Sequence, residues 1–123
     1  MKIKLAKNKG RGVFAEQAYK PGDVIEVCPV IILPVSQRKH INQTELAHYY
    51  FNWKPKKQML AAIALGHGSL YNHSYQPNAR YSLRFDKQAI LISAVKPISS
   101  GDEILINYNG EPNDKKKLWF EVK

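Results

Sequence analysis

Turn residues cut this chain into short segments, and that spacing constrains its fold more than any other feature of the sequence. Residues 20–25 (KPGDVI) and 96–104 (KPISSGDEI) both place a proline and a glycine just before a run that contains β-branched residues. Proline fixes φ and glycine permits a tight turn, so each segment predicts a turn that leads into a strand. Two short matches make no period, so they indicate a shared turn and not a repeat architecture.

Strand patterns account for most of the remaining chain. The segment 23–33 is rich in Val and Ile but contains Pro29, which predicts two short strands or a bulge. The segment 59–65 is apolar throughout, so its period alone does not separate helix from strand. Asp86-Lys87 lies between two strand-like segments and predicts a hairpin. The other strand-like segments are 3–5, where Ile3 and Leu5 alternate with lysines as in a half-buried edge strand, 79–85, 89–95 and 104–108.

One helix is predicted. Asn42-Gln43-Thr44-Glu45 has the spacing of a capping box ahead of residues 46–53, and Pro55 would end the helix. Many short strands with little helix indicate a single, mainly β domain.

Composition narrows the class of protein. With 123 residues and 44% apolar content, the chain can form one core and is not disordered. Its net charge of +9 would attract nucleic acid, acidic proteins or anionic surfaces. Cys28 is the only cysteine, which excludes an intrachain disulfide and a cysteine-rich zinc cluster. The basic N-terminus lacks the apolar segment of a secretory signal, and no apolar stretch is long enough for a membrane span. We expect a reduced, soluble, intracellular protein.

Four stretches could carry chemistry, and each also has a purely structural interpretation. One of them, residues 48–53 (HYYFNW), is an aromatic patch late in the predicted helix, and most of it should be core. Residues 9–14 (KGRGVF) would let backbone N–H groups approach a ligand, or form a plain hairpin turn. Residues 71–78 (YNHSYQPN) could be a well hydrogen-bonded loop. His67 and His73 make a poor metal site, since no carboxylate or thiol lies near them in sequence. Residues 101–110 (GDEILINYNG) end an apolar strand in Tyr108, which could be a core tyrosine.

Taken together and in order, these motifs resemble the SET domain of protein lysine methyltransferases. The resemblance runs from about Lys9 to Gly110. It is carried by three motifs, G-R-G-V-F-A, N-H-S-x-x-P-N and G-D-E-I-x-I-x-Y-x-G. It implies a mainly β, β-clip-like SET fold with several small sheets around a C-terminal pseudoknot and one short helical insert. The domain would span 1–123, with a core of about 9–110 and a C-terminal closing segment at 111–123. Asn78 would be structural.

The resemblance also implies the site. S-adenosylmethionine would lie against Lys9, Gly10, Arg11 and Gly12, with contacts from Asn72 and His73, and no metal is required. Tyr108 would be catalytic, at the junction of the cofactor pocket and a lysine channel, with Tyr49 as its partner. The walls of that channel are assigned to Tyr49, Tyr50, Tyr71 and Ile106. The small Ile106 predicts room for more than one methyl group on the product.

The chemistry fits a site with few charges. Lysine has a pKa near 10.4, so making its amine neutral at pH 7 costs about 4–5 kcal/mol. A narrow aromatic channel lowers that cost by disfavouring the ammonium.

One departure concerns the end of the chain. Many SET enzymes close the channel with a cysteine-rich zinc segment, which Cys28 alone cannot supply. The tail 111–123 is expected to replace it, with Trp119 and Phe120 packing over cofactor or substrate; the alternative is an exposed tail behind the lysine run 115–117.

Other hypotheses remain open at this stage. The basic residues could serve a nucleic-acid-binding module, because six of the first twenty residues are Lys or Arg and Glu16 is the only acid there. A non-catalytic SET scaffold is a third alternative. The protein could be a monomer or a homodimer, and it could be nuclear in a eukaryotic host. A basic enzyme would repel a basic acceptor protein unless acids gather at the groove, and the candidate rim acids are Asp86, Asp102, Glu103, Glu111 and Asp114.

Overall fold

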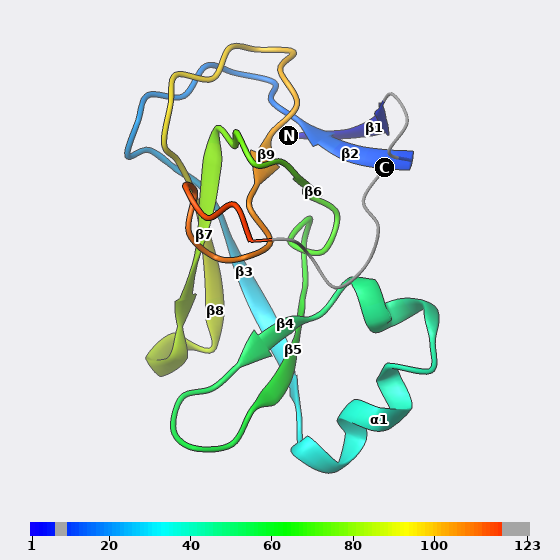
Figure 1. The fold of residues 1–123 in the computed structure, drawn as a ribbon. Helices are drawn as coiled ribbons and strands as arrows, with labels where there is room; N and C mark the ends of the chain where they lie inside the picture. The colour runs from blue at the N-terminus through cyan, green and yellow to red at the C-terminus, as the bar shows by residue number, and fades with distance from the viewer. Residues whose placement is uncertain (7–9, 117–123) are drawn as a thin grey trace.

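One long strand, β3 (Val24–Leu33), organises the largest sheet of the computed structural model, which describes residues 1–6 and 10–116. Its first half pairs with β8 (Ala89–Ala94) and its second half with β5 (Leu60–Ala64), both antiparallel. β4 (Phe51–Trp53) and β7 (Ala79–Arg84) complete the strand order β4-β5-β3-β8-β7. Figure 1 shows how this sheet forms the lower body of the molecule.

Pro29 neither splits β3 nor makes a bulge, contrary to the prediction. It lies where the strand changes neighbours, and its carbonyl accepts the first hydrogen bond from the β5 side, from Leu65 N at 2.9 Å. A missing N–H costs little at such a changeover, because no continuous ladder crosses it. The register irregularity lies instead between Val24 and Glu26.

The predicted hairpin is confirmed. β7 and β8 pair from Ala79↔Ala94 to Arg84↔Ala89, and a single 3-10 turn, η3 (Phe85–Lys87), joins them. The ambiguous segment 59–65 contains a strand, β5, whose backbone pairs with β3 on one side and β4 on the other.

The predicted helix over 46–53 is wrong. The insert consists of η1 (Val35–Gln37), α1 (Arg38–Ile41) and η2 (Glu45–His48), and Thr44, not Asn42, caps η2 by accepting a hydrogen bond from Leu46 N. Residues 51–53 form β4 because their backbone pairs with β5. Trp53 is then fully buried, with its ring edge-on to Phe85 at 4.8 Å. Tertiary pairing and burial outweigh a weak local helical signal.

β1 (Lys2–Ala6) and β2 (Gly10–Phe14) form a separate antiparallel pair at the top of Figure 1. Leu5 is 81% exposed, so the predicted half-buried alternation fails at this position. β2 is tied to the body through backbone hydrogen bonds from Ile104 N to Val13 O at 2.8 Å and from Ala15 N to Asp102 O at 2.9 Å.

A third, small sheet joins the two distant motifs. β6 (Asn72–His73) pairs in parallel with β9 (Leu105–Ile106). Asn78 bridges the crossing, because its Nδ2 donates to Glu103 O at 2.9 Å and its Oδ1 accepts from Leu105 N at 2.8 Å. The prediction of a mainly β fold with several sheets and one short helix is confirmed.

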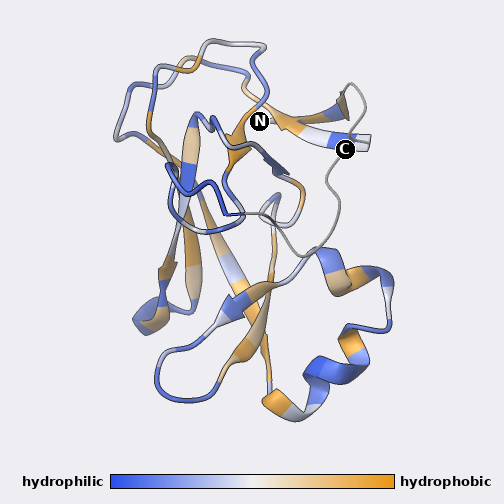
Figure 2. Ribbon diagram, viewed as in Figure 1, coloured by the Kyte–Doolittle hydropathy of each residue, from blue (hydrophilic) through white to orange (hydrophobic). Residues whose placement is uncertain are grey.

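The core lies where the sheets meet. Figure 2 shows apolar segments along the strands and polar loops at the periphery. Fully buried side chains include Val13, Cys28, Trp53, Tyr71, Ile90, Ile92, Ile98, Ile104 and Ile106. Burial, and then the nearby Glu26 carboxylate, raise the pKa of the Cys28 thiol to about 12, so this cysteine stays protonated. Among the described residues no helix is long and apolar enough to cross a membrane.

Asn78 gives a test of the crossing. Asn78→Ala removes both partners of a part-buried backbone N–H and C=O, so we expect a loss of about 2–4 kcal/mol in unfolding free energy by urea titration. Asn113→Ala, at an exposed asparagine, is the control and should change stability by less than about 0.5 kcal/mol. Equal effects of the two substitutions would show that the Asn78 bridge does not hold the crossing.

Candidate active site

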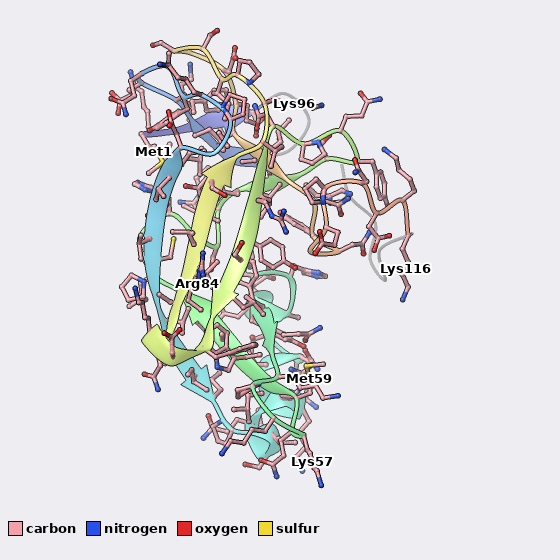
Figure 3. The ribbon with its side chains drawn as sticks, turned by 90° about the vertical axis from the view of Figure 1, so that its left-hand side faces the viewer. Met1, Lys57, Met59, Arg84, Lys96 and Lys116 are labelled. Carbon is pink, nitrogen blue, oxygen red and sulfur yellow. The ribbon has the colours of Figure 1, made fainter. Side chains whose placement is uncertain are left out.

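A groove with a cavity volume of about 790 Å³ runs between the helical insert, β4, β7 and the segment that follows β9. Seven of the described aromatic residues line it, and Tyr108 is among them. Figure 3 shows Met59 and Lys116, two residues of the groove rim, along one side of the molecule. The aromatic lining residues are Tyr49, Tyr50, Phe51, Tyr71, Tyr81, Phe85 and Tyr108.

Tyr108 is fixed at three points. Its hydroxyl donates to the carbonyl of Tyr71 at 2.7 Å, and its backbone N–H donates to Nδ1 of His73 at 3.0 Å. Its own carbonyl accepts from the hydroxyl of Tyr81 at 3.0 Å. Because Nδ1 of the buried His73 imidazole accepts this hydrogen bond, that nitrogen carries no proton. The phenol of Tyr108 therefore has a defined position at the groove.

The Tyr108 hydroxyl is also held in its neutral form. Burial raises its pKa to about 12, and the neighbouring Tyr49 and Glu103 add smaller contributions in the same direction. Burial, followed by the charge of Glu111, raises the pKa of Tyr81 to about 12. The phenols at this site can donate and accept hydrogen bonds over the whole physiological pH range.

The glycine motif reaches the same region through Asn72. Gly10, Arg11 and Gly12 lie in β2, and Nδ2 of Asn72 donates to Arg11 O at 3.0 Å and to Oε2 of Glu103 at 2.7 Å. A Cβ on Gly12 would collide with the ends of the Asn72 and Glu103 side chains, so a larger residue there would displace the hydrogen bond between them. The three sequence motifs are thus adjacent in space.

Tyr49 and Tyr50 differ in their surroundings. Tyr49 is near enough to Tyr108 to influence its pKa, and both line the groove. The hydroxyl of Tyr50 donates to Oδ1 of Asn42 at 2.7 Å, and its ring lies beneath the guanidinium of Arg38 at 5.2 Å. The hydroxyl of Tyr50 is therefore tied to the helical insert.

The other two channel candidates are both buried, but Tyr71 lines the groove and Ile106 does not. Ile106 is fully buried and is not among the residues that line the groove. The ring of Tyr71 is buried, with its hydroxyl donating to Oε1 of Glu26 at 2.7 Å, so its backbone carbonyl is the atom that meets Tyr108. Two further candidates, Lys9 and Trp119, lie outside the described residues, as does Phe120.

Sequence analysis missed two residues that position this site. The hydroxyl of Tyr81 donates a hydrogen bond to the Tyr108 carbonyl. The carboxylate of Glu26, in β3, accepts a hydrogen bond from the Tyr71 hydroxyl. Strand alternation places Tyr81 in a strand, but neither residue has a local motif that reveals its long-range partner.

The residues present fit a cationic, amino-acid-like cofactor such as S-adenosylmethionine. Both described hydrogen bonds of the Asn72 amide use Nδ2, which leaves Oδ1 as the atom that can accept from an ammonium group. The Glu103 carboxylate beside Asn72 suits a nearby positive charge. No group of three or more potential metal ligands occurs within residues 1–6 and 10–116.

Comparison with known proteins gives the family. A model of the SET domain matches residues 10–109. A histone-lysine N-methyltransferase of Schizosaccharomyces pombe, named for lysine 37 of H3, is 30% identical over 122 residues and covers 98% of this chain and 77% of its own length. The Danio rerio N-lysine methyltransferase KMT5A-A is 27% identical over 119 residues, and the match covers 88% of this chain but only 35% of that protein.

Solved structures show the same fold. A candidate histone methyltransferase of Plasmodium falciparum superposes with a TM-score of 0.69 at 29% identity, over 87% of this chain and 90% of that one. The Cryptosporidium protein CpSET8 gives a TM-score of 0.68 at 21% identity, over 86% of this chain and 56% of that one, which supports the fold alone. Because the family model covers most of the chain and the relatives agree with it, the chain belongs to the SET-domain family, and the prediction of a protein-lysine methyltransferase is confirmed at the level of the family.

Proposed function

We propose that this protein transfers a methyl group from S-adenosylmethionine to the side-chain amine of a lysine in a protein, with Tyr108 as the catalytic residue. The observation that carries the proposal is the position of Tyr108. Its phenol lines the groove, while the strand before it pairs with β6, which carries Asn72 against the Gly10–Gly12 segment. One residue thus connects an aromatic groove with a region suited to the cofactor.

The groove favours the reactive form of the acceptor. Only the neutral amine has a lone pair that can attack, and loss of water from the amine on binding beside Tyr49 and Tyr108 would disfavour the ammonium. The Tyr108 hydroxyl donates to Tyr71 O, so its oxygen lone pairs are available to accept a hydrogen bond from the amine and orient it. Fixed alignment of reactants then supplies much of the rate enhancement.

The cofactor would be held by residues of two strands, β2 and β6. Asn72 Oδ1, the backbone of His73 and the backbone of residues 10–12 would bind it, and the exposed Arg11 suits its carboxylate. When bound, S-adenosylmethionine supplies a methyl group on a positively charged sulfur. The Tyr108 hydroxyl is kept neutral by burial, so its oxygen would accept weak C–H hydrogen bonds from that methyl group. A neutral phenol would not compete with the lysine amine as a nucleophile.

The setting of the reaction follows from the relatives. Histone methyltransferases among them support a protein substrate and a nuclear or other intracellular location. Nucleic-acid association through the basic surface, the monomer or homodimer state, closure by the tail and more than one methyl per lysine stay predictions.

Removal of the Tyr108 hydroxyl tests the proposal. Tyr108→Phe should lower kcat/KM for methyl transfer at least about a hundredfold, because the amine loses its orienting oxygen. Transfer is measured with labelled S-adenosylmethionine and a host-cell lysate. Tyr19→Phe, which removes another core hydroxyl, should retain wild-type activity.

Thermal shift separates loss of catalysis from loss of binding. S-adenosylmethionine at a hundred times its Kd should stabilise both the wild type and Tyr108→Phe by about 2.7 kcal/mol. A wild-type protein that neither labels any lysate protein nor gains stability with the cofactor would refute the proposal.

The raised tyrosine pKa values predict alkaline instability. The folded protein keeps the protons of Tyr81 and Tyr108 up to about pH 12, whereas the unfolded chain releases them near pH 10, so stability falls as pH rises above 10. Each tyrosine should contribute about 1 kcal/mol of this loss at pH 11. Urea titrations at pH 8 and pH 11 measure it. Tyr108→Phe should show a smaller loss than the wild type, and an identical loss would contradict the burial of its hydroxyl.

A further inference from the structure

Among the charged residues that line the groove, cations outnumber anions. Besides His48, the described charged residues that line it are three cations, Lys54, Arg80 and Lys116, and one anion, Glu111. They belong to different segments: Lys54 follows β4, Arg80 lies in β7, and Lys116 lies beyond β9. Positive charge therefore surrounds the aromatic floor from several directions.

The other candidate rim acids do not offset this charge. Asp102 accepts from Ser99 N at 2.9 Å, Glu103 from Asn72 at 2.7 Å, and Asp114 from Lys116 N at 2.8 Å. Asp86 lies in η3, at the tip of the β7–β8 hairpin. None of the four lines the groove, so the condition for accepting a basic segment, acids gathered at the groove, is not met by the described residues.

Two of the three cations carry the excess charge. Nη2 of Arg80 donates to Oε2 of Glu111 at 3.3 Å, so this pair offsets one positive charge with the one described acid that lines the groove. Lys54 and Lys116 are exposed, and neither side chain is in an ion pair within residues 1–6 and 10–116.

We propose that the acceptor lysine lies in a segment with acidic side chains close to it, so that the substrate is an acidic lysine-containing region of a protein. The inference rests on the proposed function and specifies its substrate class. Acids on both sides of the lysine would meet the separate cations, since Lys116 lies well apart from the Met59 end of the groove (Figure 3). A strongly basic segment would meet uncompensated positive charge.

Matched peptides test the substrate class. Each peptide carries one lysine, flanked within three positions by Asp and Glu, by Ser and Gln, or by Arg. Binding is measured by fluorescence anisotropy, and methyl transfer by labelled S-adenosylmethionine. One exposed ion pair changes affinity by up to about fivefold, so two or three pairs should favour the acidic over the basic peptide about tenfold at low salt. The preference should shrink towards unity at 0.5 M salt, because the charges are screened.

Charge reversal at the groove identifies the responsible residues. Lys54→Glu and Lys116→Glu should each reduce the preference for the acidic peptide about threefold or more. The control is Lys57→Glu, which changes an exposed lysine three residues from Lys54 that does not line the groove, and it should leave the preference unchanged. An equal effect of all three substitutions would assign the preference to net charge alone and overturn the inference.

The two measurements separate this inference from the proposed function. Tighter binding of the acidic peptide without methylation would support the charged groove and count against the enzyme. Methylation with a preference for the basic peptide would keep the enzyme and overturn the acidic substrate class. Absence of binding to every peptide at low salt would also overturn it.

Discussion

The parallel pairing of β6 with β9 is the contact on which the rest of this molecule depends. Each strand has only two residues, yet the pair brings Asn72 and His73 beside the strand that leads to Tyr108. Such a short pair cannot hold itself together by its own ladder. It is held by side chains, since Asn78 bonds the backbone on either side of Ile104 and His73 bonds the N–H of Tyr108. The active-site geometry is therefore a consequence of polar side chains bonded to backbone at a crossing.

Neutral hydrogen-bonding groups form the centre of the site, and charged groups lie around it. The Tyr108 and Tyr81 hydroxyls and the His73 imidazole make the contacts around the proposed reacting position, and burial keeps both phenols protonated. A carboxylate in their place would stabilise the lysine ammonium and so oppose its deprotonation. Of the acids near the two phenols, Glu103 accepts a hydrogen bond from Asn72, and Glu111 is paired with Arg80. This separation suits a reaction that needs a neutral amine on one side and tolerates a cation on the other.

Local patterns in the sequence located most strands, because alternation and turn residues act within a few positions of one another. They failed where a distant partner decided the outcome: residues 51–53 became β4 through β5, and Pro29 was accommodated by a change of neighbour. The contact between Asn72 and the glycine motif was accessible only through the family resemblance. No local rule predicts that Glu26 anchors Tyr71 or that Tyr81 holds Tyr108, since these pairs join separate strands.

Net charge illustrates the same limit in a functional property. The sequence total of +9 attracts any polyanion and does not say where a ligand binds. The fold gives the groove a local excess of positive charge. Three nearby acids accept hydrogen bonds from Ser99 N, Asn72 and Lys116 N, and Glu111 pairs with Arg80, while Lys54 and Lys116 at the groove are exposed. Acids engaged by the fold cannot move to neutralise a basic substrate without giving up those hydrogen bonds. The same contacts that order the crossing and the segment after it therefore set the electrostatic character of the groove.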